Sequence, residues 1–278
     1  MAPQRLTLHL DPVRSAENLS TVIDVLARNP AERFPDLASI SRRVQEDYDF
    51  TDRTEPLSLA RLLGLLTAER GGCRLSANAT SIAAMRPASR ADVLHFLLAT
   101  AWHDGADPEL GCAWAYRAYC NRLWAQGSVR LDAAEAKSAV ADLLSEAQEA
   151  FPEVRLAALS PKSVLGMRKW FEPLDPSVVT SDQFRRREVC SPELVLMAVG
   201  HVAQSDGAVV GSDLPITPAR REAVCRICLL EPAALDRALD RTIPVFPSIL
   251  EPGTRSGAHG RFIRLKAMPT IERIHASR

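Results

Sequence analysis

The stretch at residues 246–265, FPSILEPGTRSGAHGRFIRL, contains side chains whose types and spacing suit phosphate binding. Two short apolar runs flank a segment rich in glycine, and this pattern predicts a β-hairpin with a long turn. Arginine offers a planar fork of N–H donors that fits phosphate oxygens. The candidate phosphate contacts are Arg255 and His259 in the turn, Arg261 and Arg264 in the second strand, and Lys266 directly after it.

The charge of this region supports the same interpretation. From residue 252 to residue 278 there are six basic side chains and one acidic side chain, so the segment carries a net charge of +5. Side chains alternate between the two faces of a strand, so Arg261 and Arg264 should leave from opposite faces. The alternative is structural, because charged residues on an edge strand also protect a sheet from aggregation.

The helix expected at 231–245 precedes the hairpin and adds two further candidates, Arg237 and Arg241. Both could contact bases or phosphates if the helix entered a groove of duplex DNA. Asp236 and Asp240 lie beside them and weaken the attraction to phosphate. Arg237 and Asp240 are spaced i to i+3 and could instead form a pair on a solvated face.

A second basic segment comes earlier in the chain. It contains Lys162, Arg168 and Lys169 and is followed by three arginines at 185–187. These side chains would extend a positive track only if folding placed them beside the hairpin.

The sequence has no recognisable catalytic or metal-binding pattern. Cys225 and Cys228 form the motif CRIC, but a structural zinc site needs four ligands and no second pair follows. These cysteines are expected to be small buried residues of a helix. The chain has no Gly-x-Ser-x-Gly elbow, phosphate loop or dinucleotide fingerprint. We therefore expect no enzyme activity, no cofactor and no metal.

The expected elements that position these residues are mostly helices, recognised by apolar periodicity and by capping residues. In the first third, helices are expected at 17–28, 34–48 and 57–66, with a short strand at 73–75. In the middle, helices are expected at 91–102, 111–127, 131–151 and 160–171. The aromatic residues of the middle are expected to form a helical core.

The last third has the clearest order of elements. PELVLMAVGHVAQ predicts a helix, GAVVGSDLPI a short strand, PARREAVCRICLL a second helix and EPAALDRALDRTIPV a third, and the hairpin then follows. This order, over residues 191–268, resembles the winged helix-turn-helix superfamily, and residues 15–80 resemble it more loosely. The resemblance implies that the third helix enters the major groove while the hairpin, or wing, contacts the adjacent backbone.

The predicted fold class is therefore mainly α with small β wings, with two winged-helix domains flanking a helical middle. The expected domains are 1–85, an N-terminal winged-helix-like domain; 86–180, a helical middle; and 181–278, a C-terminal winged-helix domain. The helix at 57–66, LSLARLLGLL, is apolar nearly all round, so it should pack against the middle or a partner rather than contact bases.

Composition limits the class of protein. The 34 basic and 34 acidic residues balance, so no global charge directs the chain to nucleic acid or to an anionic membrane. No apolar stretch approaches the length of a membrane span, and six scattered cysteines suit reduced thiols. We expect a cytoplasmic protein, and the use of 30 arginines against 4 lysines suggests a GC-rich bacterial source.

Together these features predict a non-enzymatic bacterial protein that binds duplex DNA by its phosphate backbone through the C-terminal wing. The alternative is a winged-helix adaptor for protein–protein interaction, a subunit of a bacterial chromosome-maintenance or phage-defence complex. Protein partners or a homo-oligomer fit that alternative, and no membrane partner is expected.

Overall fold

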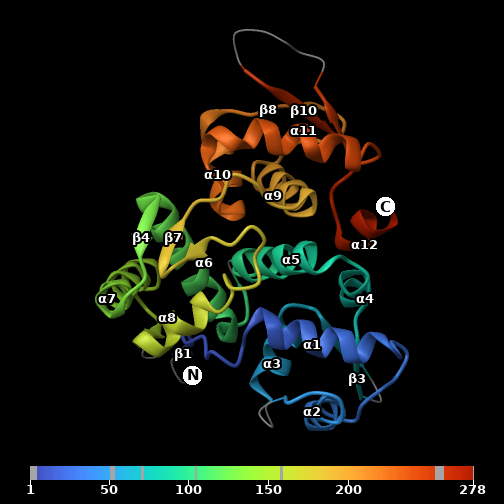
Figure 1. The fold of residues 1–278 in the computed structure, drawn as a ribbon, viewed down its shortest axis with the longest axis vertical. Helices are drawn as coiled ribbons and strands as arrows, with labels where there is room; N and C mark the ends of the chain where they lie inside the picture. The colour runs from blue at the N-terminus through green and yellow to red at the C-terminus, as the bar shows by residue number, and fades with distance from the viewer. Residues whose placement is uncertain are drawn as a thin grey trace.

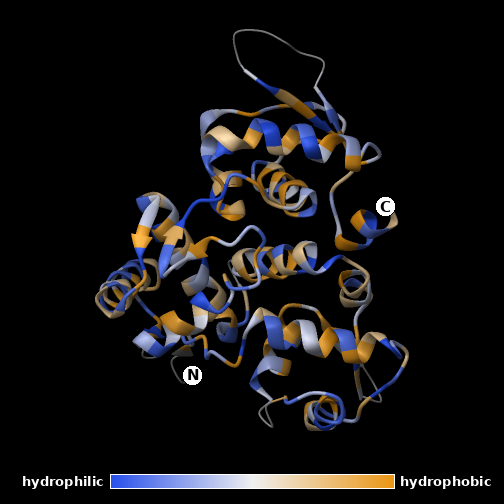
Figure 2. Cartoon of the chain, viewed as in Figure 1, coloured by the Kyte–Doolittle hydropathy of each residue, from blue (hydrophilic) through white to orange (hydrophobic). Residues whose placement is uncertain are grey.

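The structure, a computed structural model, describes residues 5–50, 54–69, 72–103, 105–156, 159–253 and 260–277 (Figure 1). Within these ranges the chain is mainly α-helical with small β elements, as the sequence predicted. Helices α1 and α11 carry both hydrophobic and hydrophilic residues along their length (Figure 2). That pattern is expected of helices with one buried face.

The N-terminal part has three helices followed by a two-stranded antiparallel hairpin. Its elements are α1 (Ala16–Ala27), α2 (Leu37–Gln45), α3 (Glu55–Leu62), β2 (Leu66–Glu69) and β3 (Gly72–Leu75). Ser15 and Asp36 cap the first two helices through their side-chain oxygens. Phe34, between α1 and α2, forms an isolated antiparallel bridge with Cys73 of β3. The segment after the first helix therefore pairs with the last strand.

The predicted helix at 57–66 is shorter than expected. It ends at Leu62, and Gly64 adopts a positive φ of 71° before Leu66 begins β2. A left-handed residue at this point stops the helix, and glycine adopts that conformation without a steric cost. Leu57, Leu59 and Ala60 are buried. The main contacts of α3 are with α1, α2 and β2 of the N-terminal part, and not with the helical middle that was predicted as one of its two packing partners.

The middle of the chain is a helical body with two small β elements. Its helices are α4 (Ala77–Ala83), α5 (Pro87–Thr100), η1 (Pro108–Leu110), α6 (Gly111–Gln126), α7 (Ala133–Ala150) and α8 (Pro161–Arg168). Tyr116 and Tyr119 of α6 are fully buried against Phe171, which confirms the predicted aromatic core.

The β elements of the middle were not predicted. One is an antiparallel sheet in the order β4-β7-β6, made of β4 (Ser128–Arg130), β6 (Val179–Thr180) and β7 (Gln183–Arg185). The other is a parallel pair of β1 (Arg5–Leu6) and β5 (Arg155–Leu156). Strands of two or three residues are too short to show a period-two pattern, so local periodicity could not identify them.

The C-terminal part repeats the connectivity of the N-terminal part. Its elements are α9 (Pro192–Ser205), β8 (Asp213–Pro215), α10 (Pro218–Cys228), η2 (Pro232–Ala234), α11 (Leu235–Val245), β9 (Leu250–Pro252) and β10 (Phe262–Leu265). The strands form an antiparallel sheet in the order β8-β10-β9, with Ile263 paired to both Leu214 and Pro252. The strand after the first helix again pairs with the last strand.

The last helix connects the C-terminal part to the rest of the molecule. Helix α12 (Ile271–Ala276), which was not predicted, packs against α4 (Figure 1). The segment leading to it crosses α9 at Gly200, where a Cβ atom would lie 2.6 Å from Pro269 Cδ. Glycine is therefore required for this close approach. The predicted domain boundaries at 85 and 180 remain predictions.

No helix in the described ranges is long and apolar enough to cross a membrane.

Candidate nucleic-acid interface

Helix α11, strand β10 and the residues that flank this strand contain five of the eight described candidate phosphate contacts, namely Arg237, Arg241, Arg261, Arg264 and Lys266. Leu235, Leu239 and Thr242 are buried on one side of α11, whereas Arg237 and Arg241 are exposed on the other. Strands β9 and β10 lie next to this helix, and the hairpin that they form extends away from the body of the protein (Figure 1). The C-terminal part therefore presents a solvent-facing helix and a protruding hairpin.

Arg261 connects the hairpin to α11. Its Nη2 donates to Asp240 Oδ1 at 2.7 Å, and its Nη1 donates to the backbone oxygen of Asp236 at 2.9 Å. The side chain of Arg261 is only 22% exposed. Most of its hydrogen-bonding capacity is thus directed to the protein, which lowers the attraction that it can offer to a phosphate.

Arg264 and Lys266 are also paired with carboxylates. Arg264 lies between its cross-strand neighbours, with Nη2 at 2.9 Å from Asp213 Oδ1 and Nη1 at 3.3 Å from Glu251 Oε1. Lys266 Nζ lies 3.4 Å from Glu251 Oε2. Arg261, which directly precedes β10, contacts α11, whereas Arg264 contacts the two flanking strands.

The two arginines of α11 differ in their surroundings. Arg237 Nη2 lies 3.4 Å from Glu188 Oε2, and both side chains are well exposed. The predicted pair between Arg237 and Asp240 does not form. Arg237 instead contacts Glu188, and Asp240 accepts a hydrogen bond from Arg261. Arg241 is exposed and has no ion pair within the described ranges. Arg255 and His259 lie outside the described residues, so their predicted contacts are not assessed.

The second basic segment does not join the hairpin. Helix α8 lies in the helical body beside β1, well away from β10 (Figure 1). Lys162 Nζ lies 3.3 Å from Asp11 Oδ2, and Lys169 Nζ lies 2.9 Å from Glu172 Oε1. These side chains therefore do not extend a positive track from the hairpin.

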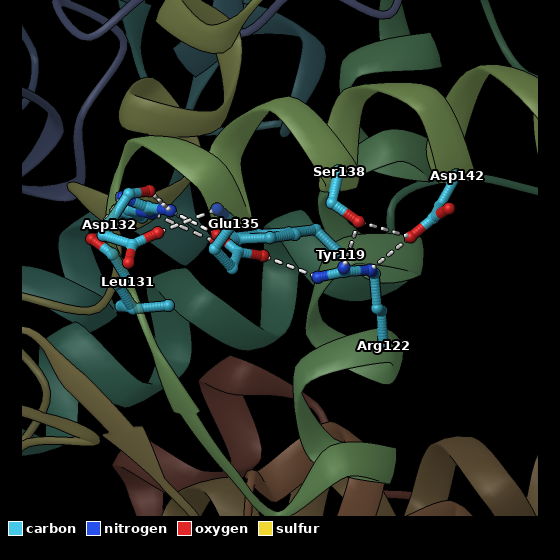
Figure 3. A network of polar contacts seen from close by, with 8 residues as sticks. Tyr119, Arg122, Leu131, Asp132, Glu135, Ser138 and Asp142 are labelled. Carbon is cyan, nitrogen blue, oxygen red and sulfur yellow. Dashed lines mark hydrogen bonds and ion pairs between the residues drawn. The ribbon is translucent and has the colours of Figure 1, made fainter.

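Tyr119, Arg122 and Glu135 belong to a polar network of the helical body (Figure 3), and Arg168 joins this network. Its guanidinium donates to Glu135 and, at 3.1 Å, to the hydroxyl of Tyr119, while Arg122 Nη1 donates to Glu135 Oε1 at 2.5 Å. Glu135 is buried. This network ties α6, α7 and α8 together, so Arg168 has a structural role here.

A buried ion pair lies at the start of the C-terminal part. Arg187 Nη1 lies 2.8 Å from Asp92 Oδ1, and their side chains are 1% and 0% exposed. Asp92 Oδ2 also accepts from the backbone N–H of Ser191 at 2.8 Å. The sequence interpretation missed this pair. Asp92 and His95 within the apolar run ADVLHFLL could have indicated a buried polar contact, because charged and polar residues are rarely buried without partners.

His95 lies beside this pair and is fully bonded. Its Nε2 lies 2.8 Å from the backbone oxygen of Ile227, and its Nδ1 lies 2.7 Å from the hydroxyl of Tyr116. A carbonyl oxygen only accepts, so Nε2 carries the proton and Tyr116 donates to Nδ1. Burial, together with the charge of Arg187, lowers the pKa of His95 to about 4. His95 is therefore neutral near pH 7.

The depressed pKa of His95 predicts a loss of stability in mild acid. Unfolded His95 binds a proton below its ordinary pKa of about 6.5, whereas folded His95 resists protonation until about pH 4. The contribution of neutral His95 to the free energy of unfolding is therefore fully present above pH 6.5. It is lost as the pH falls from 6.5 to 4, by up to about 1.4 kcal/mol per pH unit. Urea unfolding of the wild type and of His95→Gln at pH 7 and pH 4.5 measures the effect. If the free energy of unfolding of the wild type falls between pH 7 and pH 4.5 by no more than that of His95→Gln, the predicted role of His95 is contradicted.

The cysteines show no metal-binding arrangement. Within the described ranges no group of three His, Cys, Asp or Glu side chains is placed to hold a metal ion. Cys225 and Cys228 are buried and free, as predicted, and burial raises the pKa of Cys225 to about 12. Thiols with raised pKa values are poor nucleophiles and poor metal ligands.

Comparison of the chain with protein-family models, with curated proteins and with solved structures found no match.

Proposed function

We propose that the chain is a non-enzymatic protein that binds duplex DNA through α11 and the hairpin of its C-terminal part. The proposal treats the C-terminal part as a winged-helix domain and the N-terminal part as a second one. Its support is the shared connectivity: three helices, two antiparallel strands, and a segment after the first helix that pairs with the last strand. A bacterial source and a cytoplasmic location remain part of the proposal.

The observation that carries the proposal is the exposed face of α11 beside a protruding hairpin. In helix-turn-helix proteins the second helix of the motif lies in the major groove, and flanking elements contact the backbone. In the proposed winged-helix domain α11 would be that helix, and it exposes Arg237 and Arg241. Helix α3, at the equivalent position of the N-terminal part, buries Leu57, Leu59 and Ala60. The C-terminal part is therefore the better candidate for DNA contact.

The charges around α11 indicate which kind of DNA contact to expect. Asp236 and Asp240 lie on the same helix as the two exposed arginines, and Asp240 is paired with Arg261. These carboxylates reduce the local positive potential, so binding should be of moderate strength and directed to phosphates. A binder of this kind loses affinity steeply as salt rises, because it releases counterions from the DNA.

The test is fluorescence anisotropy of a labelled random duplex across a salt series. The wild type should bind with a Kd of about 1–100 μM at physiological salt, which is typical of contacts to phosphate without base recognition, and more tightly at low salt. Arg241→Ala should weaken binding about threefold to tenfold and make the salt dependence shallower. Arg130→Ala is the matched control, because Arg130 is an exposed arginine of β4 in the helical body. Equal effects of the two substitutions would contradict the proposed interface.

The second candidate is a winged-helix adaptor that binds a protein partner. The observation in its favour is that seven of the eight described candidate cations each have a carboxylate within 4 Å: Lys162, Arg168, Lys169, Arg237, Arg261, Arg264 and Lys266. Side chains already neutralised within the protein have less to gain from phosphate. Absence of any duplex binding at low salt would favour the adaptor over the DNA-binding protein.

A further inference from the structure

Three cysteines lie together where the C-terminal part joins the helical body, and the proposed interface does not use them. Cys190 lies just before the start of α9, whereas Cys225 and Cys228 lie in the last turn of α10. A parallel bridge between Arg187 and Leu230 brings the two segments side by side. The three thiols are free, and the residues are 8%, 0% and 0% exposed in chain order.

Hydrogen bonds hold the two segments against each other. The backbone N–H of Arg187 donates to the oxygen of Leu229 at 2.9 Å, and the N–H of Glu231 donates to the oxygen of Arg187 at 2.9 Å. The Nε of Arg187 donates to the backbone oxygen of Cys228 at 2.9 Å. Cys190 and Cys228 approach each other from these paired segments, and a hydrogen bond between the two thiols joins their side chains.

An uncommon backbone conformation produces this pairing. Leu229 ends α10 with a φ of 52°, in the left-handed region that residues with a branched side chain rarely adopt. The left-handed residue turns the chain directly after Cys228, so that Leu230 can lie beside Arg187. Such conformations persist where the surrounding structure enforces them, and they are frequent at functional sites.

The buried guanidinium of Arg187 interacts with both thiols of the pair. Burial opposes its charge, but Asp92 and then Cys190 attract it, and the pKa of Arg187 is raised. Its Nη1 is paired with Asp92, whereas its Nη2 is buried and has no hydrogen-bond partner among the described residues. A buried N–H without a partner is costly. An oxygen atom added to a neighbouring sulfur would accept from it, so the site is suited to an oxidised cysteine.

We propose that Cys190 and Cys228 form a reversible disulfide when the protein meets a peroxide. The bond would tie the start of α9 to the end of α10, at the junction between the helical body and the C-terminal part. This inference goes beyond DNA binding and does not depend on it.

The reaction has two steps, and Cys190 reacts first because it is the most exposed of the three cysteines. Its sulfur attacks one oxygen of hydrogen peroxide. The S–O bond of a sulfenic acid forms as the O–O bond breaks, and the second oxygen leaves as water with the proton of the thiol. The sulfur of Cys228 then attacks the sulfur of Cys190. The S–S bond forms as the S–O bond breaks, and a second water leaves with the proton of Cys228.

Contact with Cys190 identifies Cys228 as the thiol that completes the bond. Burial, and then Cys190, raises the pKa of Cys228, which makes this thiol a weak nucleophile. Its position compensates, because a group held against its target reacts at a high effective concentration. Cys225 is directed elsewhere, since its Sγ donates to the backbone oxygen of Glu231 at 3.9 Å.

Peptide mapping of the full chain tests the proposal. The reduced protein is treated with excess hydrogen peroxide, its remaining thiols are alkylated in denaturant, and the chain is digested with trypsin. Trypsin cleaves after Arg226 and so separates Cys225 from Cys228. The peptides that contain Cys190 and Cys228 should be joined, and dithiothreitol should release them. Absence of a joined pair, or a pair with Cys225 in place of Cys228, would overturn the proposal.

Cys228→Ala tests the order of the two steps. Without the second thiol, Cys190 should be oxidised further to a sulfinic acid, which dithiothreitol does not reduce. Cys120→Ala is the matched control, because Cys120 is another buried cysteine of a helix, and it should form the disulfide as the wild type does. Circular dichroism confirms that the variants fold, and the mapping of the wild type decides the matter if Cys228→Ala does not. A folded Cys228→Ala in which Cys190 remains a thiol would overturn the proposal.

Discussion

Replacing Arg187 with methionine is expected to lower the free energy of unfolding by about 3–5 kcal/mol. The substitution leaves the carboxylate of Asp92 fully buried without its cationic partner, since Asp92 is 0% exposed. Removing one member of a buried ion pair is costly because the remaining charge has lost its hydration and gains nothing in return. Urea unfolding at pH 7, followed by far-ultraviolet circular dichroism, measures the change.

The position of the pair explains why its loss should affect the whole molecule. Arg187 Nε donates to the backbone oxygen of Cys228 at 2.9 Å, and Asp92 accepts from the N–H of Ser191 at 2.8 Å. The pair therefore connects α5 of the helical body to the start of α9 and the end of α10. Weakening it should loosen the attachment of the C-terminal part.

Two controls separate loss of the pair from loss of an arginine. Arg185 is exposed two residues earlier, so Arg185→Met should change the free energy of unfolding by no more than about 0.5 kcal/mol. The double variant Arg187→Met with Asp92→Leu removes both charges and should recover much of the lost stability. A double variant no more stable than Arg187→Met would show that packing, and not the unpaired carboxylate, causes the loss.

Replacing Asp240 with asparagine is expected to tighten duplex binding about fivefold at low salt, equivalent to about 1 kcal/mol. The carboxylate of Asp240 is 68% exposed on α11 and accepts from Arg261 Nη2 at 2.7 Å. Its removal deletes one repulsive charge from the proposed interface and releases a guanidinium that can then contact phosphate. The slope of the logarithm of the binding constant against the logarithm of the salt concentration should become steeper by about one. This corresponds to about one further counterion released from the DNA.

The matched control for this substitution is Asp142→Asn. Asp142 is an exposed carboxylate of α7 that also accepts from an arginine, Arg122, at 2.9 Å. The substitution changes the net charge by the same amount but acts far from α11 (Figure 1). An equal gain in duplex affinity for both variants would show that the change in net charge causes the effect, and not the position of Asp240 on α11. A loss of affinity in Asp240→Asn would contradict the proposed role of α11.

Local signals in the sequence were sufficient to predict most helices and the order of the C-terminal elements. Ser191 and Thr217 cap α9 and α10 through their side chains, and each is followed by a proline at the first helical position. The glycine-rich turn likewise identified the hairpin that contains β9 and β10. These signals act over a few residues, so they can be recognised without knowledge of the tertiary structure.

The partners of the charged residues could not be predicted in the same way. Asp11 meets Lys162, and Asp92 meets Arg187, across long separations in the chain. Such contacts depend on how the helices pack, which no local pattern specifies. The predicted phosphate contacts were chosen by charge and position alone, and the structure shows that packing engages most of them within the protein. Arg241 is the exception among those described.

The proposed interface is tested most directly by hydrogen–deuterium exchange of the full chain with and without a saturating duplex at low salt. The account predicts slower exchange in α11 and in the strands β9 and β10, with no change in α3 or α8. Protection confined to α8, or to the N-terminal helices, would contradict it. Unchanged exchange throughout the chain would also contradict it and would leave the adaptor as the better supported function.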